Sequence, residues 1–376
     1  MTSPKPVTLY GASHSLYTGR ARSYLIKAGV AYREQAMNSS HYKSVVRAKA
    51  GGRASLPTLE LATGEVIRDG AAIIDHYEAA LGHPFSPPKP KHNLISLLFD
   101  AIGAEGLLRP AMHYRWNFDA DNLAFLEYHF GMLTEPGERG AERAQAFMNL
   151  MRNQATPSFG VSADTAPTIE AVYADQLAVL DQHFAAYGYL LGGRPCIGDF
   201  GMIAPLFAHL GRDPKPLALM QANAMSVYRW VERMNRPAAD LGEYQNQDET
   251  WLAGDEIPET LIAVLRVMAE DFVPETLAAA DCINAWLADQ PGLEPGTECA
   301  RGVGMGAFEL RGTPINALAQ PYRFHLLKRV HTAYDALEPD DRAAVDSLLD
   351  ASGMSPVIAA RLSRDIGRHN NLEVWL

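Results

Sequence analysis

A proline at position 57 constrains the fold of this chain more than any other single residue. It follows Leu56 and opens a short β-prone run at residues 57–60, and a second such run at 65–68 follows the turn at 63–64. Proline gives no N–H to a sheet, so it stands at an edge, at the first residue of a strand, or where something else uses the neighbouring backbone. We therefore predict a β-hairpin that starts at a cis Leu56–Pro57 bond, with a peptide ligand as one user of the Leu56 backbone.

The segments around this hairpin alternate between strand and helix. Residues 7–10 and 30–36 are β-prone, and the helical segment between them follows Ser15. Residues 38–49 and 71–80 are predicted helices, and the second of these starts where free amide N–H groups attract a carboxylate. A strand, a helix and a strand within about 30 residues form a βαβ unit with a parallel pair. The complete order, βαβαββα, is that of the thioredoxin-like fold.

The chain is long enough for two or three domains. Four prolines in residues 82–90 indicate a stiff connection, so the first domain is predicted to span 1–84. A second, all-helical domain is predicted at 91–237 and a mostly helical extension of unknown role at 238–376, which gives an α+β fold class. The predicted helices of the second domain are 93–118, 122–133, 138–153, 168–187, 200–210 and 220–234. The extension is predicted to hold a helix at 257–287, a strand at 307–311 and further helices from residue 322 onward.

Composition excludes several classes of function. The formal net charge is −11, which disfavours nucleic acid or an anionic membrane surface as a partner. No stretch approaches the roughly 18 apolar residues of a membrane span, and the first six residues have no apolar targeting segment. The three cysteines are far apart and in no metal-binding spacing, so we expect neither a disulfide framework nor a metal site. These features predict a cytoplasmic protein.

Four local motifs, in order and spacing, resemble the cytosolic glutathione transferase superfamily over about residues 7–237. They are Leu9-Tyr10 followed by Ser15, then Leu56-Pro57, then residues 68–73 (RDGAAI), and then residues 193–200 (GRPCIGDF), which resemble the capping element of the central helix in the helical domain. The resemblance implies a thioredoxin-like glutathione-binding domain, a helical second domain and a homodimer. It also implies glutathione as co-substrate.

The same resemblance suggests roles for individual residues. Ser15 would face the glutathione sulfur, with Ser13 and Tyr10 as alternatives. Leu56 and Pro57 would pair with the cysteinyl part of glutathione through the Leu56 backbone. Asp69 would meet the γ-glutamyl ammonium, but Gly70 stands where the family has a serine that donates to the γ-glutamyl carboxylate. That missing charge-assisted hydrogen bond is worth roughly 1.5–3 kcal/mol.

These positions also have plain structural interpretations. Ser15 and Asp69 are both good helix N-caps, and Pro57 fits an edge strand. Tyr10 fits a core position at a strand end, and His14 is expected to be exposed. A glutaredoxin-like redox role would need a cysteine at the start of the first helix, and residues 15–18 supply none.

The electrophile that reacts with the glutathione thiol should bind at the first long helix of the helical domain. Arg109, Met112, His113 and Trp116 are predicted to line an apolar pocket there, with Arg109 or Arg115 favouring an anion, although such a stripe is also typical of a core. We therefore expect an enzyme that conjugates glutathione with a small hydrophobic or anionic electrophile, as in detoxification. The alternative is a non-catalytic ligand-binding or scaffolding protein of the same fold with impaired glutathione binding.

Overall fold

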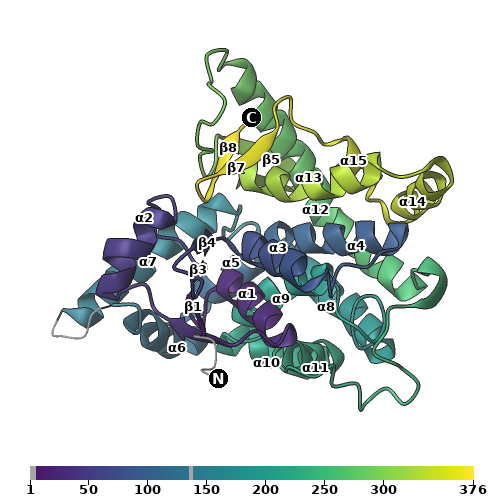
Figure 1. The fold of residues 1–376 in the computed structure, drawn as a ribbon, viewed down its shortest axis with the longest axis horizontal. Coiled ribbons are helices and arrows are strands. Elements are labelled where there is room, and N and C mark those ends of the chain that lie inside the picture. The colour runs from purple at the N-terminus through teal and green to yellow at the C-terminus, as the bar shows by residue number, and fades with distance from the viewer. Residues whose placement is uncertain (1–5, 135–138) are drawn as a thin grey trace.

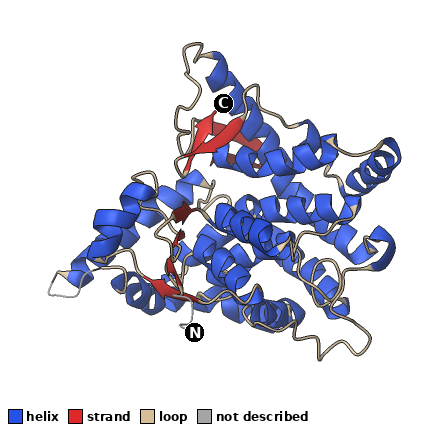
Figure 2. Cartoon of the chain, viewed as in Figure 1, coloured by secondary structure: helices blue, strands red, loops and turns tan. Residues whose placement is uncertain are grey.

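The computed structural model describes residues 6–134 and 139–376, and within them the chain has the predicted α+β fold class. Figure 1 shows an N-terminal sheet with its helices, a large helical region, and a C-terminal part that lies along one side of both. In Figure 2 the strands are red, and those of the N-terminal sheet lie apart from those near the C-terminus. The first residue of the predicted helix 138–153 and the N-terminal residues 1–5 lie outside the described residues.

The N-terminal domain has the predicted βαβαββα order. Its elements are β1 (Val7–Tyr10), α1 (Leu16–Lys27), β2 (Tyr32–Gln35), the π-helical turn η1 (Tyr42–Val46) continued by α2 (Arg47–Lys49), β3 (Thr58–Glu60), β4 (Val66–Arg68) and α3 (Gly70–Leu81). The strands are ordered β2-β1-β3-β4, with β1 and β2 parallel and the other pairs antiparallel. The Leu56–Pro57 bond is cis, as predicted.

Alternation along the strands gives the sheet two covered faces. Leu9, Leu59 and Ile67 belong to a core cluster that includes residues of α1 and α3. Tyr10 and Val66 belong to a second cluster, on the side of η1. Because side chains alternate between the faces of a strand, this pattern follows directly from the sequence.

The strand register brings the predicted ligand residues to one end of the sheet. Tyr10 pairs with both Gln35 and Thr58, and Thr58 pairs with Arg68. The segments just beyond this row, residues 11–15, 36, 57 and 69, therefore gather at the same end. We call it the Pro57 end of the sheet.

The helical region follows a short connection. Its elements are α4 (Pro90–Ala101), the π-helical turn η2 (Ile102–Gly106), α5 (Leu108–Trp116), α6 (Asp119–Gly131), α7 (Gly140–Ser158), α8 (Ala166–Ala186), α9 (Ile197–Ala208), α10 (Pro214–Asn223) and α11 (Met225–Met234). The start of α9 is capped as its motif predicted, because Asp199 Oδ2 accepts from the Cys196 amide at 2.9 Å.

The prediction of one continuous helix at 93–118 is wrong. The chain passes from α4 through η2 to α5, and the irregular turn lies where α9 crosses. A Cβ atom on Gly103 would lie 2.1 Å from the carbonyl carbon of Gly201, so the crossing depends on glycine at this position. Pro110 lies in the first turn of α5, where proline is tolerated.

The C-terminal extension contains more strand than predicted. Its elements are η3 (Ala253–Asp255), α12 (Glu259–Ala288), β5 (Met305–Leu310), β6 (Thr313–Leu318), α13 (Pro321–Asp335), α14 (Pro339–Ser352), α15 (Ser355–Ala359), β7 (Ile366–His369) and β8 (Leu372–Trp375). β5 pairs with β6 and β7 with β8, both antiparallel. The hairpin of β7 and β8 was missed because each strand is only four residues long. Its turn residues Asn370 and Asn371 both have positive φ, which asparagine tolerates.

The extension packs on the rest of the molecule. α12 contacts α8, and α13 and α14 contact α4. Figure 1 shows α13 beside α3 and α4, and β7 and β8 near β4. None of the helices in residues 6–134 and 139–376 is long and apolar enough to cross a membrane.

Candidate ligand site at the Pro57 end of the sheet

Ser15 begins α1 at the Pro57 end. Its half-buried side chain is the N-cap of the helix, and Oγ accepts from the Thr18 amide at 3.3 Å. A hydroxyl accepts with its lone pairs and keeps one hydrogen to donate. Capping the helix and donating to a thiolate are therefore compatible roles for Ser15.

Tyr10 does not face this site. Its hydroxyl donates to Glu60 Oε2 at 3.0 Å, and Glu60 pairs with Thr8 at the opposite end of β3. Burial and the Glu60 carboxylate raise the pKa of Tyr10 to about 12. The alternative that made Tyr10 the hydroxyl donor is wrong, because the side chain lies on the face of the sheet that η1 covers.

Ser13 makes a different contact, to α6. Its Oγ lies 3.0 Å from Nδ1 of His129, beside a hollow of about 340 Å³ lined by residues of the β1–α1 loop, the end of β2 and the end of α6. His14 borders the same hollow but is only 4% exposed, so the expectation that it is exposed is wrong. Burial, together with nearby Arg115, lowers the pKa of His14 to about 2, and the ring is uncharged.

Arginines hold the β1–α1 loop in place. Three consecutive carbonyls accept from three guanidinium groups: Ala12 from Arg22 at 3.3 Å, Ser13 from Arg212 at 3.0 Å and His14 from Arg115 at 3.0 Å. The donors come from α1, from the loop before α10 and from α5. The loop that carries the two candidate serines is therefore fixed from three sides.

Leu56 has an unused backbone. Among the described residues, no group donates to its carbonyl or accepts from its amide, and the residue is half-buried. The next carbonyl, of Pro57, accepts from the Asp69 amide at 3.0 Å. The Leu56 peptide groups are thus left for a ligand or for water.

Asp69 caps α3 and is already well supplied with donors. Its Oδ1 accepts from the amides of Ala71 at 2.9 Å and Ala72 at 3.2 Å, and its Oδ2 accepts from the Tyr322 hydroxyl at 2.6 Å. Burial raises the pKa of this carboxyl, but Arg368 and the Tyr322 hydrogen bond outweigh burial and hold it below its ordinary value. Asp69 is therefore ionised at neutral pH.

Gly70 is glycine for a packing reason. A Cβ atom here would lie 3.3 Å from the Tyr17 carbonyl oxygen and 3.5 Å from Arg20 Cδ. A serine would press on the first turns of α1. A side chain at this position therefore needs a small adjustment of the neighbouring α1 atoms.

The extension covers the α3 side of the site. Besides Tyr322, the Asn371 side chain pairs with the backbone of edge strand β4: Oδ1 accepts from the Arg68 amide at 3.0 Å and Nδ2 donates to the Val66 carbonyl at 2.9 Å. Arg68 Nη2 lies 2.5 Å from Glu373 Oε2. A segment about 300 residues away therefore completes both the sheet edge and the helix start.

A buried ionic cluster ties α13 to this region. Asp100 of α4 lies between Arg20 of α1, at 2.5 Å, and Arg329 of α13, at 2.9 Å. Arg329 also reaches Asp75 of α3 at 2.8 Å. Through Arg329, α13 is thus paired with α3 and α4, and Asp100 in turn links α4 to α1.

Glu105 of η2 lies close to the same cluster. It is 2% exposed, Oε1 accepts from the Tyr17 hydroxyl at 3.3 Å, and Oε2 has no hydrogen-bond partner among the described residues. Burial raises the pKa of Glu105 to about 7, although nearby Arg323 opposes that rise.

The predicted electrophile pocket is wrong, because its residues are core. Arg109 is 2% exposed and forms ion pairs with Asp271 and Glu275 of α12. His113 is buried and contacts Glu170 at 2.9 Å. Trp116 and Met112 pack with residues of α6 and α7, and Arg115 pairs with Asp213. Neighbouring helices cover α5, and of these side chains only Arg115 reaches the Pro57 end, where it donates to the His14 carbonyl and does not line the hollow beside Ser13.

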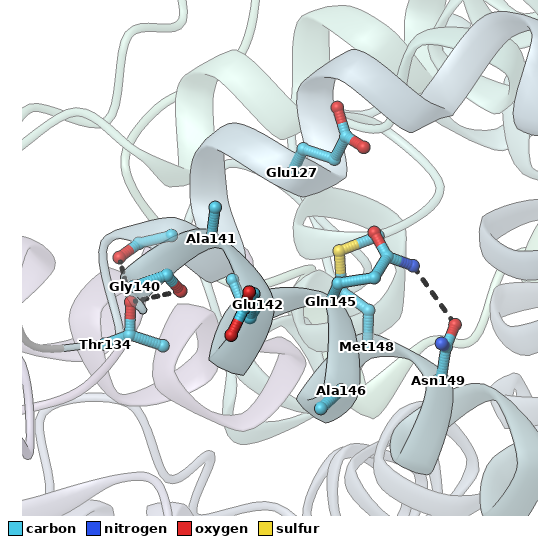
Figure 3. A pocket seen from close by; sticks show the side chains of 11 residues that line it. Glu127, Thr134, Gly140, Ala141, Glu142, Gln145, Ala146, Met148 and Asn149 are labelled. Atoms are coloured by element: carbon cyan, nitrogen blue, oxygen red, sulfur yellow. Dashed lines mark hydrogen bonds between the residues drawn. The ribbon is translucent and has the colours of Figure 1, made fainter. Parts of the chain in front are cut away.

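A larger hollow, of about 910 Å³, lies between α6 and α7. Figure 3 shows side chains from both helices around it, including Glu127 and Glu142, with Gln145 hydrogen-bonded to Asn149. None of the predicted site residues lines it. In residues 6–134 and 139–376, no group of three or more His, Cys, Asp or Glu is placed to hold a metal ion.

Sequence reasoning missed the contributions of Tyr322, Asn371 and His129. The first two meet their partners across 253 and 303 residues, and no local pattern predicts such a contact. The sequence around Tyr322 matches no motif from which a chemical role could be predicted. For Asn371, the sequence signal was the pair Asn370-Asn371, which is typical of a turn. Both residues have positive φ in the structure.

The fold and the site define a thioredoxin-like domain with a cis-proline and a helix-capping serine, joined to a helical region. Residues 9–85 match the family model described as glutathione S-transferase, N-terminal domain. This N-terminal domain is therefore of the glutathione transferase type, as its motifs predicted. The sequence matches no curated protein.

Solved structures with a similar fold include a glutathione transferase of Phanerochaete chrysosporium, 15% identical, which covers 62% of this chain and 97% of its own at a TM-score of 0.42. A β-etherase of Sphingobium is 14% identical and covers 64% of this chain and 99% of its own, also at 0.42. A glutathione transferase family member of Pseudomonas fluorescens, solved with two glutathione bound, is 14% identical and covers 65% and 94% at 0.38. Similarity at this level says nothing about the chemistry of this chain.

Proposed function

We propose that this protein is a glutathione transferase-like enzyme that joins a thiol, with glutathione as the reference thiol, to a small electrophile. One observation carries the proposal: the cis Leu56–Pro57 segment leaves the Leu56 peptide groups unpaired at the end of the sheet where Ser15 begins α1. The match of the N-terminal domain to the glutathione S-transferase family model supports it. We also propose the units 1–84, 91–237 and 238–376, a homodimer and a cytoplasmic location, all of which remain predictions.

The proposed chemistry needs a thiolate. A thiol with a pKa of about 8.5 is only a few per cent ionised at neutral pH. The Ser15 hydroxyl would donate to the sulfur, and the amides at the start of α1 would add a favourable field, so the thiol pKa falls while Ser15 keeps its own proton. The thiol proton leaves to solvent, and the thiolate attacks the electrophilic carbon. The new C–S bond forms as the bond to the leaving group breaks, and that group departs with its electron pair, as chloride does from 1-chloro-2,4-dinitrobenzene.

The test is conjugation of glutathione with 1-chloro-2,4-dinitrobenzene, corrected for the spontaneous reaction. Ser15→Ala is expected to lower kcat/KM by about tenfold or more, because it removes the hydrogen bond to the thiolate. Ser13→Ala is the matched control and is expected to retain most of the activity, since Ser13 points to His129. Wild-type protein that neither binds glutathione at millimolar concentration nor conjugates any thiol would exclude the proposal.

A second candidate function is favoured by a specific contact. Tyr322 occupies Oδ2 of Asp69, and Gly70 supplies no hydroxyl, so the γ-glutamyl end of glutathione lacks two expected partners. A non-catalytic ligand-binding or scaffolding protein of this fold would show the same features. Equal rates for wild type and Ser15→Ala, at the spontaneous level, would favour this candidate.

A further inference from the structure

The side chain of Tyr322, a residue of α13, reaches Asp69 at the start of α3. If the proposed function holds, a γ-glutamyl group would meet Asp69 there. We propose that Tyr322, held in place by the C-terminal extension, closes this end of the site, so that the enzyme prefers a cysteinyl thiol without a γ-glutamyl residue, such as cysteinylglycine, to glutathione. This inference rests on the proposed function and specifies which thiol substrate the enzyme prefers.

The first argument is the state of Asp69. Its carboxylate already accepts three hydrogen bonds, two from the start of α3 and one from Tyr322 at 2.6 Å. The charges of Arg368 and Arg20 act on it as well. An incoming ammonium would compete with the Tyr322 hydroxyl for Oδ2 and would stand close to two guanidinium groups. Both effects oppose binding of an α-amino group here.

The second argument is the anchoring of Tyr322. Arg323, next to Tyr322, and Arg329, about two turns further along α13, fix the helix: Arg323 lies 2.9 Å from Glu275, and Arg329 bridges Asp100 and Asp75. Arg323 is buried, and its Nη1 also donates to Thr276 Oγ1 at 3.0 Å. Moving Tyr322 away from Asp69 would strain or break these pairs. The closure is therefore part of the folded core.

The third argument concerns the carboxylate of the same γ-glutamyl head. Gly70 has no donor side chain, and a Cβ atom there would already lie 3.3 Å from the Tyr17 carbonyl oxygen and 3.5 Å from Arg20 Cδ. Arg20 gives its Nη2 to Asp100, while its buried Nε and Nη1 have no hydrogen-bond partner among the described residues. The head group therefore finds neither a free carboxylate for its ammonium nor a hydroxyl for its carboxylate.

The cysteinyl part of the site remains available. The Leu56 peptide groups have no partner among the described residues, and Ser15 keeps its donor hydrogen. The hairpin of β7 and β8 seals the sheet edge beyond, where a Cβ on Gly51 would lie 2.6 Å from Leu372 Cγ. The Leu56 peptide groups and the Ser15 hydroxyl are the polar partners that a cysteinyl thiol would use.

The experiment compares kcat/KM for glutathione and cysteinylglycine with the same chlorodinitrobenzene, in wild type, Tyr322→Phe, Tyr322→Ala and Tyr334→Phe. Tyr334→Phe is the matched control, because Tyr334 lies in the same helix and donates to Asp346 at 2.6 Å, away from the site. Wild type and Tyr334→Phe are expected to favour cysteinylglycine. Removing the Tyr322 hydrogen bond or ring is expected to raise kcat/KM for glutathione by about ten- to a hundredfold and to leave cysteinylglycine nearly unchanged.

Wild type that favours glutathione, or Tyr322 variants that lose glutathione activity while folded, would overturn the inference. Calorimetric binding of the S-methyl forms of both thiols to wild type and Tyr322→Phe gives a readout independent of catalysis and of the larger substitution. If no thiol is conjugated but the S-methyl forms bind with the expected preference, the proposed enzyme activity fails and the closure stands. Equal binding of the two forms to both proteins would overturn the closure.

Discussion

Replacing Glu105 by glutamine is expected to stabilise the protein at alkaline pH and to change little in acid. Glu105 is 2% exposed, and its Oε2 has no hydrogen-bond partner among the described residues. Burial penalises the ionised carboxylate and raises the pKa from 4.5 to about 7, although Arg323 opposes it. Glutamine keeps an acceptor for the Tyr17 hydroxyl and carries no charge.

The sign and size follow from proton linkage. The folded state keeps the Glu105 proton in a range where the unfolded state has released it, so this residue costs stability as the pH rises from about 4.5 to 7. At about 1.4 kcal/mol for each pKa unit, the full cost above pH 7 is about 3 kcal/mol. Near pH 5 the cost is about 1 kcal/mol, because the folded carboxyl is still protonated.

The assay is urea unfolding of wild type and Glu105→Gln at pH 5 and pH 8. The variant is expected to gain about 3 kcal/mol at pH 8 and about 1 kcal/mol or less at pH 5. Glu259→Gln is the control, since that side chain is 77% exposed and its removal should change little at either pH. An equal gain at both pH values, or a loss at pH 8, would refute the reasoning about burial.

Two more substitutions test the contacts of the extension. Arg109→Met strips the buried Asp271 of its counter-charge and should cost about 3–5 kcal/mol in urea unfolding, against about 1 kcal/mol or less for the exposed Arg152→Met. Asn371→Ala should speed hydrogen exchange of the β4 amides about thirtyfold, equivalent to about 2 kcal/mol of lost hydrogen bonding. Asn370 also has a positive φ but makes none of those bonds, so Asn370→Ala is the control and should leave the exchange of the β4 amides unchanged. Equal exchange rates in the two variants would contradict the role of Asn371.

The sequence predicts the N-terminal domain well because its signals are local. Pro57 starts a strand and is cis, Ser15 and Asp69 cap helices as their side chains allow, and strand alternation gives both faces of the sheet. Each of these features depends on a few neighbouring residues. The match of residues 9–85 to one family model covers the same segment.

The site beyond that segment is poorly predicted because its decisive contacts are remote. The stripe of Arg109, His113 and Trp116 marks an apolar helix face, but periodicity does not say whether a ligand or other helices cover that face. Here α12, α8 and the α6–α7 pair do so. Likewise, no residue near Asp69 in the sequence indicates that the Tyr322 hydroxyl will donate to its carboxylate.

Asn371 also determines when the sheet becomes complete during synthesis. The backbone of β4 emerges about 300 residues before the side chain that pairs with it. At roughly 5–20 residues per second, the strand edge stays open for about 15–60 s while the rest of the chain is made. Open strand edges are sites of intermolecular pairing. The nascent chain is therefore exposed to misassembly through β4, and synthesis of the segment that carries Asn371 ends that interval.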